Sequence, residues 1–446
     1  MALVKEMKSA TIYTIVLLIL MAAFLTVNQF GLSEMFPVFV AVCWTVIIVA
    51  YVILITFHSI KESTYQCVVI ASFFLKMLLL VIDIFSNHVV ETLLNGTDAP
   101  TFREMSLMYY EHNTLPRNLY SYVLAFQYNI FGSSYFVTIL INITLFTLGT
   151  VYIIRTIKLS GSRSFLLWVV VSSFAPYVLL HSVLLLREAI YFFASAASFH
   201  FFALYILKQR RMKYFIYAIL LTGPMILLHQ GNIAITLAYL MGYFNASTKK
   251  LVLRISLKKF LFDFAIVAFS VIALRYVSTN GYLSLSERRL FGSITGTYRS
   301  RFLQEGGSRY LNWMPVPSNW IQLVLFTPLR MLYFLFAPLP TNWRNWKDIV
   351  SFLMDSSIYL CGFYYLCSAL HSKRSDRKLR ILVQVGAYMM FNVALIFGWG
   401  TATAGAAIRH RLALIPMICS VSAIAKNKSA SKWFGIERMN YEPRCK

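Results

Sequence analysis

Charged side chains stand at several places where the surrounding sequence is apolar, and their types suit the chemistry of phosphate groups. Arg187 and Glu188 follow the apolar run "HSVLLL", and Arg409, His410 and Arg411 lie within "TAGAAIRHRLALIP". Charged residues at membrane depth are costly and usually mark a water-filled site or a pathway. A departing pyrophosphate in an outward-facing membrane cavity needs cations of this kind to neutralise it.

Helix geometry limits what these groups can do together. Arg187 and Glu188 lie about 100° apart on a helix, so each needs a partner besides the other, and a ligand anion would serve Arg187. Residues 409 to 411 cover about 200° of a helix and cannot all face one pocket. We expect Arg409 and His410 to face inward, with Pro416 as a kink that opens the helix end, and at least one of the three side chains to reach the membrane interface.

An acidic stretch supplies a candidate base. In "NGTDAPTFREMSLMYYEH", Asp98 precedes Pro100 as a helix start would, and Glu104 follows in the same predicted helix. A carboxylate here can accept the proton of an attacking hydroxyl, as transfer to a sugar alcohol requires. We predict Asp98 as the catalytic base with Glu104 as a substitute. The alternative is that Asp98 only caps a solvated helix.

A second polar stretch, "NGYLSLSERRLFGSITGTYRSRFLQEGGSRYLNW", is rich in arginine. Arg299 and Arg301 can bind phosphate oxygens, while Tyr298 and Trp313 offer flat faces for sugar rings. The alternative is that these arginines pair with lipid headgroups and nearby carboxylates. We add Glu188 and the histidine of "HQGN", His229, to the predicted substrate contacts, although a single histidine in such a turn is often structural.

The composition indicates the elements that must position these residues. The chain has 446 residues, of which 59% are hydrophobic and 16% aromatic, with a mean hydropathy of +0.65. We expect an all-α polytopic membrane protein, a single transmembrane domain over 1–446 with about twelve spanning helices. The predicted spans are 10–29, 36–57, 66–85, 135–155, 164–183, 188–207, 213–228, 233–246, 259–278, 350–371, 380–399 and 404–424.

The net charge of +24 reports orientation and does not indicate a nucleic-acid partner. The basic residues of the chain concentrate in short loops between the predicted spans, as the positive-inside rule predicts. With a cytoplasmic N-terminus and tail (425–446), the loops 86–134 and 279–349 are extracytoplasmic. This threading requires the segment 319–340, with Pro328 and Arg330 at its centre, to form a re-entrant or interfacial hairpin. We include Arg330 among the phosphate-binding candidates, together with Arg187, Arg409, His410 and Arg411.

Neither a disulfide framework nor a zinc site is predicted. The six cysteines fall mostly inside apolar runs and show no paired spacing. Carboxylates such as Asp98 and Glu104 can bind a divalent metal, but the sequence shows no compelling ligand set. We therefore name no metal-ligating residue and no certain cofactor, and keep a divalent metal as an alternative.

Three segments resemble known membrane enzymes. "LYSYVLAFQYNIFGSSYFVTILINITLFTLGTVYIIRTIK" (119–158), after the early Asp-Ala pair, resembles the dolichol- or undecaprenol-dependent glycosyltransferases of the GT-C superfamily. "LLLREAIYFFASAASFHFF" and "GTATAGAAIRHRLALIP" resemble bacterial Wzy-type repeat-unit polymerases. The resemblance implies a GT-C-like fold and inverting, nucleotide-independent sugar transfer. It places Asp98 as the base, and Arg187 and Arg409 as phosphate-binding residues.

The expected function is extracytoplasmic transfer from a polyprenyl-(pyro)phosphate-linked sugar to a glycan or lipid-linked acceptor. This fits surface polysaccharide synthesis at a bacterial plasma membrane, with O-antigen or capsule polymerisation as one form. The expected partners are the lipid-linked donor, the acceptor and membrane lipids. The alternative is a flippase for lipid-linked oligosaccharides, which would expose its charged cavity to both faces in turn and show repeat-related halves.

Overall fold

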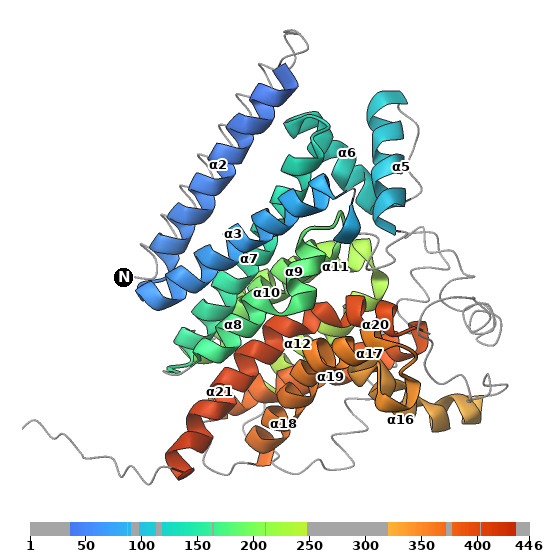
Figure 1. Ribbon diagram of the computed structural model, residues 1–446. Coiled ribbons are helices and arrows are strands. Elements are labelled where there is room, and N and C mark those ends of the chain that lie inside the picture. The colour runs from blue at the N-terminus through green and yellow to red at the C-terminus, as the bar shows by residue number, and fades with distance from the viewer. Residues whose placement is uncertain are drawn as a thin grey trace, which may run out of the picture.

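The computed structural model describes residues 36–86, 88–90, 98–112, 118–162, 165–209, 211–247, 320–371, 377–401 and 403–433. All the regular elements in these ranges are helices. Figure 1 shows them as one bundle, with the blue helices α2 (Phe36–Ser59) and α3 (Ser63–Phe85) on one side and the orange and red C-terminal helices on the other.

Short helices follow α3 and lead into the central part of the bundle. α5 and α6 pack against each other beside the end of α7, as Figure 1 shows. The helices of the first half are α5 (Asp98–His112), α6 (Leu119–Phe131), α7 (Tyr135–Leu159), α8 (Leu166–Phe174), α9 (Pro176–Ser182), α10 (Glu188–Leu204), α11 (Met212–Leu228) and α12 (Ile233–Ser247).

The C-terminal half packs against α10 and α12 and completes the bundle. Its helices are α16 (Trp320–Phe336), α17 (Trp346–Ser351), α18 (Ser357–His371), α19 (Arg377–Gly400), α20 (Ala404–Arg411) and α21 (Ile415–Trp433). A π-helical turn, Phe352–Ser356, joins α17 to α18, and a 3₁₀ turn, Leu412–Leu414, joins α20 to α21.

Helices α7 and α10 form the centre of the bundle. Both are largely buried, and a side chain at Gly149 of α7 would run into the ring of Phe192 of α10. Threonine hydroxyls of α7, such as those of Thr144 and Thr147, donate to the carbonyl four residues back, which satisfies them inside an apolar bundle. The centre of the bundle is therefore closely packed, with its polar side chains satisfied locally.

Seven of the described helical stretches are long and apolar enough to cross a membrane. They are Val40–Ser59, Ser63–Phe85, Tyr135–Leu159, Glu188–Lys208, Trp346–His371, Arg377–Gly400 and Ala404–Ala425. Each corresponds to a predicted span, which agrees with an integral membrane protein. α11 and α12 are helices at the predicted places but have only 17 and 15 residues.

One predicted span is wrong in its form. The segment 164–183 is not a single helix, because α8 ends at Phe174 and α9 begins at Pro176. Proline has no N–H and disfavours the helical conformation of the residue before it, and Ala175 has φ −53° and ψ 131°. The segment predicted as a hairpin contains one continuous helix, α16, which passes through Pro328. The predicted spans 10–29 and 259–278 lie outside the described residues.

Close packing of α12 on α19 gives a first testable prediction. A Cβ atom at Gly242 would overlap side-chain atoms of Val385 and Phe202. We expect Gly242→Ala to destabilise the protein by about 1–3 kcal/mol, because overpacking forces the helices apart. Unfolding in detergent would measure the change. Gly223→Ala on α11, where nothing lies within 4 Å of the new atom, is the control and should be tolerated; equal stability of the two variants would contradict the prediction.

Candidate functional site

Three charged side chains from distant parts of the chain meet at one place. Arg409 of α20 donates from Nη1 to Oδ2 of Asp98, the first residue of α5, at 2.8 Å. Its Nε donates to Oε1 of Glu188, the first residue of α10, at 3.0 Å. The guanidinium therefore bridges two carboxylates that lie 90 residues apart in the sequence. We call Asp98, Glu188 and Arg409, with Arg187, the carboxylate–arginine cluster.

The local sequence places each member at a helix end. Thr403 caps α20, because its hydroxyl accepts a hydrogen bond from the backbone N–H of Ala406 at 3.4 Å. The turn before α10 is fixed by Asn142 of α7, whose amide donates to the carbonyl of Leu184 at 2.7 Å. Glu188 then begins α10, where the helix dipole favours a carboxylate.

The two carboxylates differ sharply in exposure. The side chain of Glu188 is 1% exposed and that of Asp98 is 44% exposed, with Arg409 between them at 22%. A carboxylate as buried as Glu188 needs a cation, because an isolated buried charge costs several kcal/mol. Arg409 thus has one fixed partner in the protein interior and one partner open to solvent.

Arg187 flanks the same carboxylate. Its Nη1 donates to the carbonyl of Leu228 at 3.0 Å, and its guanidinium lies 5.9 Å from the centre of the Phe102 ring. Arg187 is also close enough to Glu188 to stabilise its charge. The cluster contains two arginines and two carboxylates, so its formal charges cancel.

Unsatisfied polar atoms surround the cluster. Within the described part of the chain, Nε of Arg187, Oη of Tyr191 and Oε2 of Glu188 are buried without a hydrogen-bond partner. Tyr191 lies within electrostatic range of Arg187, Glu188 and Arg409. Buried polar groups are normally paired, so several unpaired ones at one place indicate water or a ligand there.

Tyrosines beside the cluster were not predicted from the sequence. Tyr191 follows Glu188 by three residues on α10, and this spacing places both side chains on one face, which was a usable signal. Tyr120 of α6 is buried near Glu188 and Asn142. Burial raises the pKa of the Tyr120 phenol, so it remains a neutral hydroxyl at physiological pH.

The two predicted histidines also come together. The ring centres of His229 and His410 are 4.8 Å apart, and Phe397 of α19 lies 5.0 Å from the first and 4.6 Å from the second. Nδ1 of His229 accepts from the backbone N–H of Gly231 at 3.2 Å, which orients the ring. His410 follows Arg409 in the chain, and His229 follows Leu228, whose carbonyl accepts the hydrogen bond from Arg187.

Arg411 and Arg330 lie elsewhere, although the sequence suggested both as phosphate-binding residues. Arg411 is fully buried and donates to Asp355, to Ser356 and to the carbonyls of Phe334, Leu335 and Ala337. Its guanidinium is therefore bound to acceptors of the protein and does not face a ligand site. Arg330 is also fully buried, donates to the carbonyl of Thr401 at 3.3 Å and lies 5.2 Å from the Trp399 ring. Neither contacts the cluster, so we leave both out of the candidate site.

Other predicted residues do not join the cluster either. Glu104 is exposed on α5, six residues after Asp98 and therefore about 240° around the helix from it. The remaining predicted substrate contacts, Tyr298, Arg299, Arg301 and Trp313, lie outside the described residues.

No group of three or more histidine, cysteine, aspartate or glutamate side chains in the described ranges is arranged to hold a metal ion. No metal ion enters any step proposed below.

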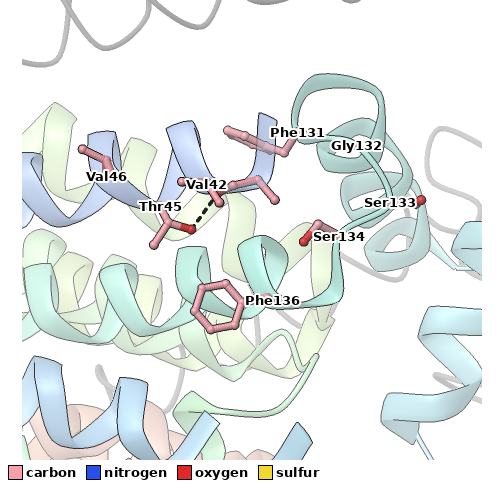
Figure 2. Close-up of a pocket in the computed structure, with 9 residues that line it drawn as sticks. Val42, Thr45, Val46, Phe131, Gly132, Ser133, Ser134 and Phe136 are labelled. Atoms are coloured by element: carbon pink, nitrogen blue, oxygen red, sulfur yellow. Dashed lines mark hydrogen bonds between the residues drawn. The ribbon is translucent and has the colours of Figure 1, made fainter. Parts of the chain in front are cut away.

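A separate apolar groove lies between α2 and the turn from α6 to α7. Its volume is about 530 Å³. Figure 2 shows the side chains that line it and the hydrogen bond from the Thr45 hydroxyl to the Ala41 carbonyl. The lining residues are Ala41, Val42, Thr45, Val46, Phe131, Gly132, Ser133, Ser134 and Phe136. None of them belongs to the cluster.

Comparison with protein-family models, with curated proteins and with solved structures found no match for this chain. The resemblance to GT-C and Wzy-type enzymes therefore remains a prediction from the sequence.

Proposed function

We propose that the protein is a membrane glycosyltransferase of GT-C-like architecture with about twelve spans. It would transfer a sugar or oligosaccharide from a polyprenyl-(pyro)phosphate donor to a glycan or lipid-linked acceptor, on the outer side of a bacterial plasma membrane. The observation that carries this proposal is the bridge from Arg409 to Asp98 and Glu188, with Arg187 beside it. It supplies a solvent-accessible carboxylate and two arginines at one point, as such a transfer requires.

The proposed reaction uses the cluster in one displacement. The acceptor hydroxyl gives its proton to the Asp98 carboxylate while its oxygen forms a bond to the anomeric carbon of the donor. The bond from that carbon to the phosphate oxygen breaks, and its electron pair stays on the lipid phosphate. Arg187 and Arg409 stabilise the negative charge that develops there. Attack opposite the leaving group inverts the anomeric configuration.

Glu188 has a positioning role in this proposal. Its buried carboxylate fixes the guanidinium of Arg409 through Nε, while Nη1 is paired with the partly exposed Asp98. A group held by a rigid partner needs no reorganisation as the leaving group becomes charged, which favours catalysis. Tyr191 adds a buried hydroxyl close to the same point.

The test is transfer by the purified full-length protein. In nanodiscs, with a synthetic polyprenyl-diphosphate oligosaccharide as donor and acceptor, we expect larger lipid-linked products. A ladder of products would identify a polymerase, and a single addition a simple transferase. Absence of any product, together with movement of the lipid-linked oligosaccharide across proteoliposome membranes, would refute the proposal and indicate a flippase.

Arg409→Lys tests the role of the planar guanidinium. Lysine keeps the charge but cannot hold Glu188 and a phosphate with separate, fixed N–H groups. We expect turnover to fall about 10- to 100-fold, because oxyanion stabilisation depends on placement as well as charge. Product formation at saturating donor would measure it. Lys347→Arg, the reverse exchange at an exposed site on α17, is the control. Wild-type turnover in Arg409→Lys would contradict this role.

A further inference from the structure

The two carboxylates that bind Arg409 differ in exposure, and this difference indicates which of the two contacts can be exchanged. Glu188 is enclosed by protein, while Asp98 is nearly half exposed and stands at the first residue of a short helix. An exchange at the Glu188 side would remove the cation that is hydrogen-bonded to a buried carboxylate and leave only Arg187 near it, which is costly. An exchange at the Asp98 side only returns a carboxylate to water. The Asp98 contact is therefore the one that another anion can replace.

A donor phosphate and the Asp98 carboxylate seek the same N–H groups. Arg409 offers Nη1 and Nη2 on its outer edge, and Nη1 is taken by Asp98. A phosphate bound to this edge would lie within a few ångströms of the carboxylate, where like charges repel. The donor phosphate and the Asp98 carboxylate therefore cannot both bind Nη1 and Nη2 of Arg409.

Unused donors show where the phosphate would gain further hydrogen bonds. Nε of Arg187 and Oη of Tyr191 are buried and have no partner among the described residues, and both groups lie around Glu188. Asp98 does not satisfy them. An anion with three or four acceptor oxygens could bind Arg409 and also reach these donors, which a single carboxylate cannot do.

We propose that Asp98 occupies the phosphate site of Arg409 when no donor is bound, and that the donor phosphate displaces it. The displaced carboxylate is then free to accept the proton of the acceptor hydroxyl. Donor would thus bind before the acceptor can react. This inference rests on the proposed function for the identity of the donor, but the exchange itself is a property of anion binding and can be measured without sugar transfer.

The experiment measures binding of inorganic pyrophosphate to the full-length protein in nanodiscs by calorimetry at fixed ionic strength. We expect Asp98→Asn to bind pyrophosphate about five- to tenfold more tightly than wild type, since it removes a competing carboxylate from a partly exposed ion pair. Glu111→Gln removes the same charge from an exposed site on α5 and should leave the affinity unchanged.

A double-variant cycle separates direct competition from a general charge effect. In the Arg409→Met background, Asp98→Asn should no longer increase the affinity, because the cation for which the two anions compete is absent. Asp98→Ala, with folding checked by gel filtration, is a second variant and should also bind more tightly than wild type. If Asp98 only tethers α5, affinity will be unchanged or lower in both variants, and the exchange is refuted.

The outcomes distinguish this inference from the proposed function. Tighter pyrophosphate binding by Asp98→Asn without sugar transfer by the wild type would support the exchange and refute the glycosyltransferase. Sugar transfer by the wild type, together with unchanged pyrophosphate binding by Asp98→Asn, would support the glycosyltransferase and refute the exchange. Absence of pyrophosphate binding in all proteins at millimolar concentration would overturn the exchange.

Discussion

Asp98→Asn is expected to lower the rate of sugar transfer by about 10²- to 10⁴-fold, the range that a general base contributes. Asparagine keeps the size of the side chain and can still accept a hydrogen bond from Arg409, so the bundle should fold as in the wild type. What it cannot do is take the proton of the acceptor hydroxyl. Initial rates of product formation at saturating donor would measure the loss.

The kinetic constants distinguish loss of the base from loss of donor binding. The loss should fall on turnover, while the apparent KM for the donor stays the same or decreases, because Asp98 no longer competes for Arg409. Glu111→Gln should keep wild-type rates. An Asp98→Asn protein with near wild-type turnover would remove Asp98 as the base, whatever its effect on phosphate binding.

The meeting of Asp98, Glu188 and Arg409 could be anticipated only in part. Glu188 and Arg409 were selected from the sequence because a charge near an apolar run is costly and needs a reason, and Asp98 was selected as a carboxylate at a helix start in an acidic loop. Their types suggested phosphate and proton chemistry. That one guanidinium joins both carboxylates could not be read from the sequence, because contacts between residues 221 and 311 positions apart depend on how the helices pack.

The sequence "RHR" shows where such reasoning ends. Helix geometry predicted that Arg409, His410 and Arg411 point in different directions, and the structure bears this out: they contact Glu188, His229 and Asp355, respectively. The spacing alone does not say which direction is the cavity. The residue types therefore identified the candidates. Only the packing of α20 shows that Arg409 belongs to the cluster and that Arg411 binds Asp355 and backbone carbonyls of the protein.

The helices themselves were more accessible to prediction. Length and hydropathy located the seven stretches that can cross a membrane, because a bilayer imposes the same length on each of them. The break between α8 and α9 was missed although Pro176 is visible in the sequence. A proline in an apolar run either kinks a helix or ends it, and neighbouring helices decide between the two.

The internal role of Arg411 follows from the end of α16. Helix ends leave carbonyls without partners, and the N–H that would pair with the Phe334 carbonyl is missing because position 338 is proline. Arg411 supplies the missing donors: Nη1 lies 3.1 Å from the Phe334 carbonyl and Nη2 lies 2.7 Å from that of Ala337. It also forms a buried ion pair with Asp355. One side chain thus joins α20 to α16 and to the turn before α18.

Arg411→Met is therefore expected to destabilise the protein by about 3–5 kcal/mol, the cost of leaving a buried carboxylate without its cation. Methionine fills similar space but offers no hydrogen bond to Asp355 or to the helix end. Unfolding in detergent would measure the change. Arg409→Met, two residues earlier, should cost less, because its side chain is partly exposed and Arg187 still lies near Glu188. Adding Asp355→Leu to Arg411→Met should restore part of the stability, since the unpaired charge is then removed. Equal stability of the two single variants would contradict the proposal that Arg411 has a structural role and Arg409 a role in the cluster.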